Sequence, residues 1–447
     1  MGGGLLQLVA YGAQDAYISG NPQITFFKGL YKRHTNFAME PFRVNFSGQA
    51  SWGTKQSAII GRHADLMYST YLEVVLAEGT YNNDQGRLGY NLLKYAELEV
   101  GGQQIDRLYG EFLYLWDALT LSTTKSINAW NMVGGGANSG SVLIGGQTVC
   151  NTGNGKPSLP NTILYVPLYF YYTRNPGAAL PLIALQYHEV KINLLWNDAT
   201  SIAGNFNNAS KTDNTGVPQP LQAAIYVDYI YLDTEERRRM AQQSHEYLIE
   251  QTQYNEDKGV SSYNNRIDLT FNHPVKELIW VVQPTAYTNC SYAKQRGYTK
   301  LYPFTYNQAA VFEQWIQING QDRMEKRYGS YFNTTQQFQH HTGAGSTHQS
   351  VPANVIITAP SSIAGNLQFQ RSQPGIYSYS FALRPEEHQP SGTCNFSRID
   401  TATIVMTMSG GVNISQDTDD TWDVRVYAIN YNILRVMSGM GGLAFSN

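Results

Sequence analysis

The sequence is poor in cysteine and in charged residues. Three cysteines, Cys150, Cys290 and Cys394, lie far apart in 447 residues, a usage that gives no disulfide framework and no metal-ligand spacing and that fits a reducing cytosol. Charged residues make up only 15% of the chain, and the formal net charge is -3. Because a surface that neutralises phosphates needs many cations, we expect no direct nucleic-acid partner.

Targeting, membrane and common catalytic signals are also missing. The first residues lack the basic segment and apolar core of a secretory signal, and no uninterrupted apolar run reaches the roughly 18 residues that span a bilayer. No GxSxG, HExxH or CxxC motif occurs. We therefore expect a protein of the soluble phase that is not an enzyme and that binds no cofactor or metal.

One stretch of sequence occurs twice. Residues 98–113 read LEVGGQQIDRLYGEFL and residues 316–332 read IQINGQDRMEKRYGSYF, so that Gly102 corresponds to Gly320, an offset of 320 minus 102, or 218. A later pair of blocks, FYYTRNPGAALPLIALQYHEV and FALRPEEHQPSGTCNFSRI, aligns four positions. These pairs are Phe170 with Phe381, Pro181 with Pro390, Tyr187 with Phe396, and Val190 with Ile399.

A third pair of blocks completes the repeat. IYVDYIYL at 225–232 aligns with VYAINYNI at 426–433 at an offset of 427 minus 226, or 201, and the middle pair has an offset of 396 minus 187, or 209. Offsets that shrink in order, with length changes confined to Gly/Asn/Ser-rich stretches, indicate two copies of one domain whose loops diverged. A chain of 447 residues also exceeds the roughly 250–300 residues at which a single core stops growing.

The composition favours β-structure in both copies. Tyrosine is frequent at 32 residues, aromatics reach 13%, and 40 glycines supply turns. Period-2 alternation, as in AELEV, predicts half-buried strands. The strands expected in the first copy are 71–77, 96–100, 164–172, 190–196 and 225–232. Gly101-Gly102 and Asn319-Gly320 predict the same tight hairpin turn in both copies.

Helical signal is scarce. It is confined to 110–121 and to the charged segment 233–251, which lies between the copies, and the stretches near 131–158, 200–219 and 340–366 are expected to be surface loops. Each copy then offers about eight strands, which predicts an all-β chain of two tandem antiparallel sandwiches. The jelly roll is the eight-stranded form of such a sandwich, but strand spacing alone does not separate it from the others.

Several polar groups resemble binding sites but have simpler interpretations. His188-Glu189 are adjacent on a strand and point to opposite faces, and Arg237-Arg238-Arg239 beside Glu235 and Glu236 is more typical of a solvated helix than of a phosphate site. Two further sets lack a complete ligand pattern: a histidine set (His340, His341 and His348) without a fourth ligand, and an acidic set (Asp417, Asp419, Asp420 and Asp423) whose calcium-loop pattern fails at Trp422 and Ala428.

Two surface features remain as candidate sites. Among the Asn-x-Ser/Thr sequons, Asn208 and Asn333 lie in loop-like sequence and are the first candidates for glycan attachment. The N-terminal segment, residues 1–26, mixes flexible glycine with apolar side chains that a solvated tail does not need. Its apolar residues are those of an expected assembly arm: Leu5, Leu6, Leu8, Val9, Tyr11 and Tyr17.

Six long blocks carry a family resemblance that runs from the first residue to the last. They are MGGGLLQLVAYGAQDAYISGNPQITFFKGLYKRHTNFAMEPF, ALPLIALQYHEVKI, YIYLDTEERRRMAQQSHEYLIEQ, GQDR, QPSGTCNFSRID and NYNILRVMSGMGGLAFSN. Together they resemble the major capsid proteins of the nucleocytoplasmic large DNA viruses, in particular those of the algal viruses. The resemblance implies two consecutive eight-stranded jelly rolls with short helices in loops and linker: an arm at 1–26, domains at 27–235 and 251–447, and a linker at 236–250.

The resemblance also implies a function. The chain would be the structural subunit of an icosahedral virion, assembled in the host cytoplasm, with three chains forming a capsomer that mimics a hexamer. Its partners would be two further copies, neighbouring capsomers, minor capsid and penton proteins and, indirectly, an inner viral membrane. From the residues alone one alternative stays open, a carbohydrate-binding or carbohydrate-cleaving double sandwich, because aromatic-rich jelly rolls also serve in those roles.

Overall fold

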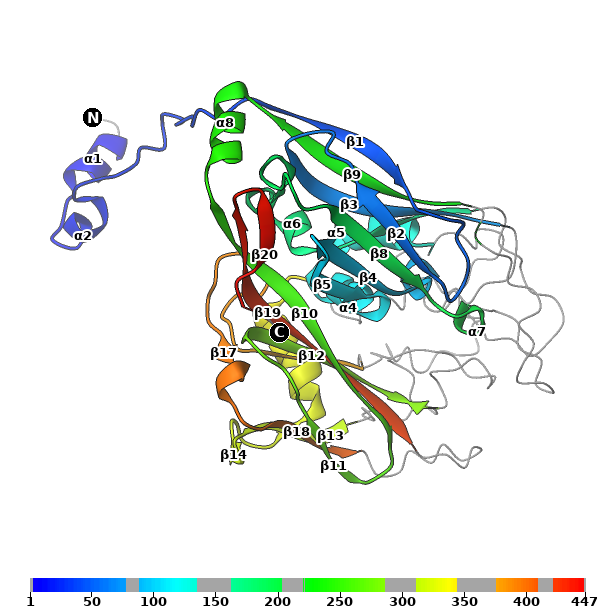
Figure 1. The fold of residues 1–447 in the computed structure, drawn as a ribbon. Helices are drawn as coiled ribbons and strands as arrows, with labels where there is room; N and C mark the ends of the chain where they lie inside the picture. The colour runs from blue at the N-terminus through cyan, green and yellow to red at the C-terminus, as the bar shows by residue number, and fades with distance from the viewer. Residues whose placement is uncertain are drawn as a thin grey trace, which may run out of the picture. The chain divides into compact units, whose positions relative to one another are not determined.

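The computed structural model describes residues 3–77, 88–134, 162–202, 220, 222–285, 311–343, 375–408 and 421–445. The chain forms two compact units, Met1–Phe37 and Ala38–Asn447. The first unit is the N-terminal arm, with the short helices α1 (Gly3–Val9) and α2 (Asp15–Ser19), and every one of its described residues is exposed. The second unit holds two β-sandwiches (Figure 1).

The first sandwich has two antiparallel sheets. Sheet 1A runs in the order β1 (Phe37–Asn45), β9 (Gln222–Leu232), β3 (Leu66–Leu76) and β6 (Thr162–Pro167), with β7 (Leu180–Pro181) beside β3. Sheet 1B runs in the order β2 (Lys55–Ile60), β8 (Val190–Trp196), β4 (Leu93–Val100) and β5 (Gln103–Tyr109). In β4, Ala96, Leu98 and Val100 are buried in the core as their alternation predicts, and Glu97 on the other face pairs with Lys55 and Arg107.

The second sandwich repeats this plan. Sheet 2A runs in the order β10 (His245–Val260), β19 (Trp422–Met437), β12 (Pro274–Pro284) and β16 (Ile376–Ser380), with β17 (Cys394–Asn395) and β20 (Met440–Leu443) at its margins. Sheet 2B runs in the order β11 (Asn264–Asp268), β18 (Ala402–Met408), β13 (Val311–Ile318) and β14 (Gln321–Asp322), with β15 (Arg327–Tyr328) beside β13.

Strand order makes both sandwiches jelly rolls. When the eight strands of either half's two sheet paths are numbered along the chain, one sheet has the order 1-8-3-6 and the other 2-7-4-5, in both halves. This order is that of two interlocked Greek keys. The predicted all-β chain of two eight-stranded jelly rolls is therefore confirmed, and topology settles what strand spacing left open.

Helices connect the strands and cover their ends. They are α3 (Leu88–Asn91), α4 (Gly110–Thr120), α5 (Thr123–Met132), α6 (Tyr171–Arg174), α7 (Ala199–Ile202), α8 (Thr234–Gln242) and α9 (Gln336–His340), with a π-helical turn at Tyr331–Thr335 leading into α9. The helix predicted at 110–121 is confirmed as α4. The one predicted at 233–251 is wrong beyond Gln242, because β10 begins at His245 and pairs with β19 along its whole length.

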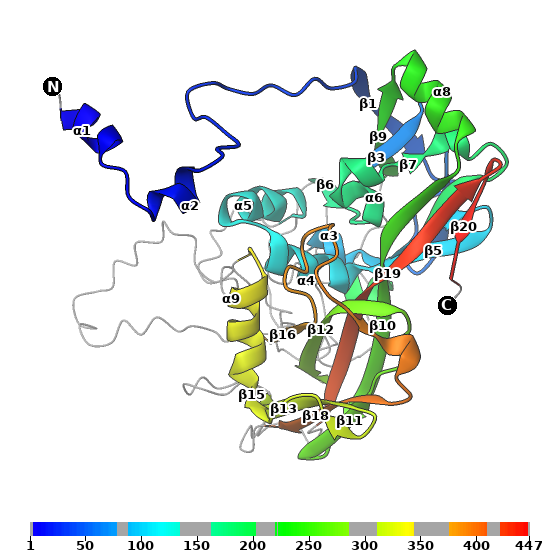
Figure 2. The ribbon, with the colours of Figure 1, turned by 90° about the vertical axis from the view of Figure 1, so that its left-hand side faces the viewer.

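Two further boundaries differ from expectation. The strand predicted at 164–172 ends at Pro167, and Tyr171 already belongs to α6. The predicted loops fall mostly on 135–161, 203–219 and 344–374, which lie outside the described residues. The long strands β10 and β19 run from the first sandwich into the second, as Figures 1 and 2 show.

The hairpin turn of the repeated block is the same in both halves. Gly101 and Gly102 have φ of +59° and +85°, and Asn319 and Gly320 have +49° and +76°. Two successive positive φ values are the signature of a type I′ turn, for which Gly-Gly and Asn-Gly are suited. The first pair of repeated blocks therefore marks equivalent turns, β4 to β5 and β13 to β14.

Three of the four positions aligned in the middle pair of repeated blocks were wrong, whereas Phe170 and Phe381 keep the offset of 381 minus 170, or 211, that separates the equivalent strand residues Tyr165 and Ile376. Leu180 pairs with Met67 of β3 and Cys394 with Val275 of β12, so that the buried Leu182, two residues further on, corresponds to Phe396, an offset of 396 minus 182, or 214.

The neighbouring strands give the same correction. Val190 and Ala402 pair with the last residues of β4 and β13, which moves the predicted partner of Val190 from Ile399 to Ala402, an offset of 402 minus 190, or 212. Tyr187 is 75% exposed and, in place of a core position, donates its backbone N–H to the Gly439 carbonyl at 2.9 Å.

Candidate functional site

The two sandwiches meet at a buried junction formed by the outer face of sheet 2A. Along β12, Leu278, Trp280 and Val282 belong to the core of the second sandwich, whereas Ile279 and Val281 belong to the core of the first. Other residues of sheet 2A on this outer face do the same: Ile249, Ile376, Tyr427 and Ile429. Because strand side chains alternate between faces, sheet 2A is an interior layer shared by both halves.

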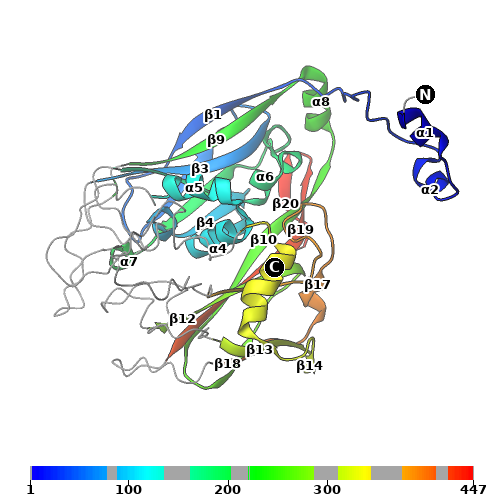
Figure 3. The same ribbon diagram turned by 180° about the vertical axis from the view of Figure 1, so that it is seen from behind.

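Helix α4 of the first sandwich makes polar contacts with this face. Arg425 Nε on β19 donates to both Glu111 carboxylate oxygens, at 3.0 and 2.8 Å, and the Tyr427 hydroxyl donates to Glu111 Oε2 at 2.5 Å. The ring of Phe112, one residue on, lies 5.6 Å from that of Tyr427. Figure 3 shows α4 where the two halves meet.

A second ion cluster lies at the same junction. Lys276 is fully buried, and its Nζ lies 2.6 Å from Glu250 Oε1, while Arg174 pairs with the other oxygen of Glu250 and stacks over Trp116 of α4. Burial lowers the pKa of Lys276 against the opposing effect of Glu250. Burial would raise the pKa of Glu250, but the charges of Lys276 and Arg174 outweigh it and hold this pKa below its ordinary value.

Strand β5 adds contacts with the backbone of β10. Asp106 Oδ1 accepts hydrogen bonds from the backbone N–H groups of Thr252 and Arg107, both at 2.9 Å. Complete burial raises the pKa of Asp106 to about 7 in spite of these bonds. The Gln251 amide donates to the Ile105 carbonyl, so side chain and backbone both fix the register between β5 and β10.

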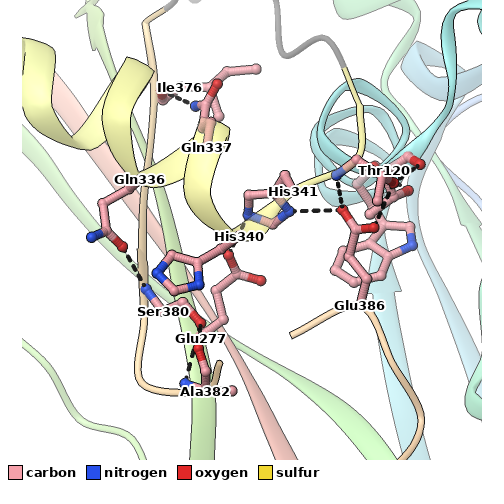
Figure 4. Close-up of polar contacts among 12 residues, drawn as sticks. Thr120, Glu277, Gln336, Gln337, His340, His341, Ile376, Ser380, Ala382 and Glu386 are labelled. Carbon is pink, nitrogen blue, oxygen red and sulfur yellow. Dashed lines mark hydrogen bonds and ion pairs between the residues drawn. The ribbon is translucent and has the colours of Figure 1, made fainter. Parts of the chain in front are cut away.

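A histidine buried between two glutamates completes the junction (Figure 4). His341 Nε2 lies 2.6 Å from Glu277 Oε1, and Nδ1 lies 3.1 Å from Glu386 Oε1. Since ionised carboxylates only accept, both ring nitrogens donate and the ring is an imidazolium. Burial would lower its pKa, but Glu277 and then Glu386 raise the pKa of His341 to about 9.

The segment after this histidine contacts the end of α4. The Gly343 backbone N–H donates to the Leu119 carbonyl at 2.8 Å. A Cβ on Gly343 would lie 2.3 Å from that carbonyl oxygen, so only glycine permits this approach between the halves. At the opposite side of the junction, Gly441 of the C-terminal hairpin packs against Leu185, and its carbonyl lies 2.9 Å from His188 Nδ1.

The sequence-predicted site residues are placed as follows. Asn208 lies outside the described residues, as do His348, Asp417, Asp419 and Asp420. Asn333 lies in the turn before α9 and is 1% exposed, so its burial argues against a glycan there in the folded subunit. Asp423 is buried and accepts from the Gly259 N–H and the Thr285 hydroxyl, which is a structural role.

The candidate residues of the N-terminal arm are exposed, unlike the buried Asn333 and Asp423. Leu5, Leu6, Leu8, Val9, Tyr11 and Tyr17 are between 55% and 93% exposed. Large apolar side chains left in water over a whole segment are typical of a surface that is covered by a partner. Within the described part of the chain, no group of three or more His, Cys, Asp or Glu side chains is arranged to hold a metal ion. Nor do the helices described there include one long and apolar enough to cross a bilayer.

The junction residues were missed by the sequence interpretation. Glu111, Arg425, Glu250 and Lys276 lie in strands and helices with no motif around them. One signal could have indicated the shared sheet: LIWVV at 278–282 does not alternate, and a short unbroken apolar run favours a strand buried on both faces.

Two like jelly rolls fused through a shared sheet define a double jelly-roll protein. A family model described as the major capsid protein N-terminus matches residues 25–233, and one described as the large eukaryotic DNA virus major capsid protein matches 236–355 and 364–442. The chain therefore belongs to the major capsid proteins of large eukaryotic DNA viruses, and it is a structural subunit of the virus capsid.

Individual relatives agree over the full length. The chain is 46% identical over 451 residues to the major capsid protein of Pyramimonas orientalis virus and 40% identical over 486 residues to that of Paramecium bursaria Chlorella virus 1, with all of each chain covered. The crystal structure of PBCV-1 VP54 superposes with a TM-score of 0.73 at 34% identity, over 95% of this chain and 100% of that one. The Faustovirus major capsid protein shares the fold, with a TM-score of 0.67 at 12% identity over 96% of this chain and 94% of that one.

Proposed function

We propose that three copies of this chain close into one capsomer in which six jelly rolls surround a threefold axis. The observation that carries this proposal is the junction: two sandwiches of the same topology share sheet 2A as an interior layer and so form one body. A body with two similar halves fills two adjacent positions of a six-membered ring. Permanent interfaces of this kind bury about 2,000 Å² or more.

Measuring the mass of the purified chain tests the proposal. Multi-angle light scattering and native mass spectrometry are expected to give three times the chain mass, unchanged on dilution into the nanomolar range. A monomer or dimer at high protein concentration contradicts it. Negative-stain images of the same sample are expected to show pseudo-hexagonal particles, which distinguishes a closed ring from an open chain of three.

The arm supplies the contacts between capsomers in this proposal. Its apolar residues cover neighbouring capsomers, minor capsid proteins or penton proteins, and it reaches an inner membrane only through those proteins. The role is structural and not enzymatic, and assembly takes place in the host cytoplasm. The support is the exposure of the arm: Leu8, Val9 and Tyr17 are each more than three-quarters exposed.

A further inference from the structure

The repeated fold gives every contact at the junction a counterpart elsewhere on the chain. Tyr109-Gly110 at the start of α4 corresponds to Tyr328-Gly329 before α9, an offset of 329 minus 110, or 219. Both glycines approach the first residue of the strand that leads into the preceding hairpin turn, β4 or β13: a Cβ would lie 2.3 Å from the Leu93 carbonyl oxygen in one half and 2.2 Å from that of Val311 in the other. The two helices thus start in the same place.

Tyr109, which packs on sheet 2A, and the buried Leu119 of α4 have exposed counterparts. The ring of Tyr109 lies 4.5 Å from that of Tyr254 and 6.1 Å from that of Tyr427. Its counterpart, Tyr328, is 62% exposed. At the same offset of 219, the buried Leu119 corresponds to Phe338, which is 88% exposed. We call Tyr328 and Phe338 the helix-side surface.

The receiving face has a counterpart as well. Tyr427 on β19 corresponds at the confirmed offset of 201 to Tyr226 on β9. Tyr226 pairs with Tyr71 of β3, and Tyr427 pairs with Ile279 of β12, so Tyr71 stands where Ile279 lies buried. In the same way, Tyr165 of β6 stands where Ile376 lies buried, and it is 40% exposed. We call Tyr71, Tyr165 and Tyr226 the sheet-side surface.

We propose that the helix-side surface of one chain packs on the sheet-side surface of the next, as the residues around α4 pack on sheet 2A within the chain. The partner is a second copy of this chain, because the two surfaces are the counterparts of two that already fit each other. Both surfaces are aromatic, and tyrosine suits a face that is wet before assembly and buried after it. The contact joins different surfaces and is therefore head-to-tail, so repetition produces a ring in which intrachain and interchain junctions alternate.

Two charge substitutions and a matched control test this inference, which rests on the proposed trimer. Tyr328→Asp and Tyr226→Asp are each expected to give folded monomers. The control is Ile59→Asp, which changes an exposed apolar side chain on sheet 1B. Its counterpart in the second half is the exposed Asp268, so this position already accepts an aspartate, and the variant is expected to stay trimeric. If the unmodified chain is not trimeric, the proposed function fails. If it is trimeric and Tyr328→Asp remains so, only this inference is overturned.

Mixing the two variants tests the head-to-tail arrangement. The intact helix-side surface of Tyr226→Asp chains fits the intact sheet-side surface of Tyr328→Asp chains, so the mixture is expected to give a one-to-one dimer that neither variant forms alone. A mixture that stays monomeric overturns the head-to-tail arrangement. An isologous contact would use both surfaces on each chain, so every pairing of the two variants would carry a damaged surface on both sides.

A milder pair of variants guards against misfolding. The double variant Tyr328→Cys/Tyr226→Cys, treated with a short bis-maleimide, is expected to give covalent species that end at three chains. Each single variant, with the three natural cysteines, is expected to remain uncrosslinked between chains. A double variant that is trimeric but yields no crosslinked chains contradicts the inference.

Discussion

Glu111 and Arg425 lie 314 positions apart in sequence, and the Arg425 guanidinium donates Nε hydrogen bonds to both oxygens of the Glu111 carboxylate. Their side chains are only 19% and 10% exposed. Removing one partner of such a pair leaves the other charge desolvated and uncompensated. We predict that Arg425→Ala lowers the free energy of unfolding by about 3 kcal/mol. Urea unfolding followed by tryptophan fluorescence measures this.

Arg435 supplies the control for that variant. Arg435 lies on the same strand, β19, and pairs with Glu246 of β10, but both side chains are more than half exposed. Arg435→Ala should therefore cost below about 1 kcal/mol. Equal losses for the two arginines would mean that burial at the junction adds nothing to the strength of the pair.

His341 makes stability depend on alkaline pH. Its pKa is raised to about 9 in the folded chain from the ordinary 6.5, so its contribution is fully present below pH 6.5 and is lost as pH rises to about 9. A shift of that size corresponds to roughly 3 kcal/mol. The unfolding free energy between pH 6 and pH 9.5 should fall for the natural chain and fall less for His341→Gln. The neighbouring His340→Gln should behave like the natural chain.

Asp106 acts in the opposite sense at lower pH. Its pKa is raised to about 7 from 3.8, so the charged form is disfavoured in the folded state and stability is lost as pH rises from about 4 to 7. Asp106→Asn keeps an acceptor for the Thr252 N–H and removes the charge. We predict equal stability of the two proteins at pH 4.5 and a more stable variant at pH 8, measured by thermal melts. A less stable variant at pH 8 would contradict the raised pKa of Asp106, because the folded chain would then favour the carboxylate over the neutral acid.

Much of the fold was readable in the sequence because local chemistry decides it. The positive φ of Gly102 and Gly320 is a property of the turn itself, and the alternation of Ala96, Leu98 and Val100 is a property of a half-buried strand. The alignment of Tyr187 with Phe396 failed because it relied on local similarity alone. A similar aromatic side chain occurs in both blocks, but loop length differs between the copies and strand pairing, which sequence does not display, fixes the register.

The junction could not be predicted because it depends on which face of a sheet meets which helix. Arg425 and Glu250 look like ordinary strand residues until the first sandwich covers them. The segment 245–251 was expected to be helical for a related reason. Its charged residues suit a helix, and only pairing with 430–436 of β19 makes it a strand. Long-range pairing of this kind overrides local preference.

Deleting residues 2–26 should separate assembly of the capsomer from assembly of the shell. The arm is a compact unit of its own, distinct from residues 38–447, and so its loss is expected to leave the trimer mass and the melting temperature unchanged. Shell formation should be lost, as scored by electron microscopy of co-expressed capsid proteins. The double variant Leu8→Asp/Tyr17→Asp should show the same loss with the full chain present. Dissociated trimers would instead assign the arm to the contacts within a capsomer.

The two glycines of the repeated block should respond differently to alanine. Gly320 has φ of +76° with nothing near its added Cβ, so Gly320→Ala costs only the left-handed backbone, about 1 to 2 kcal/mol. Gly329 lacks that strain, but its Cβ would lie 2.2 Å from the Val311 carbonyl oxygen, and backbone cannot yield as a side chain does. Gly329→Ala should therefore cost more than Gly320→Ala, about 3 kcal/mol, and should displace the start of the helix that carries Phe338. Chemical denaturation measures the loss of unfolding free energy, and loss of the trimer reports the displaced helix. If Gly329→Ala proves as mild as Gly320→Ala, the close approach that aligns α9 with α4 is not required.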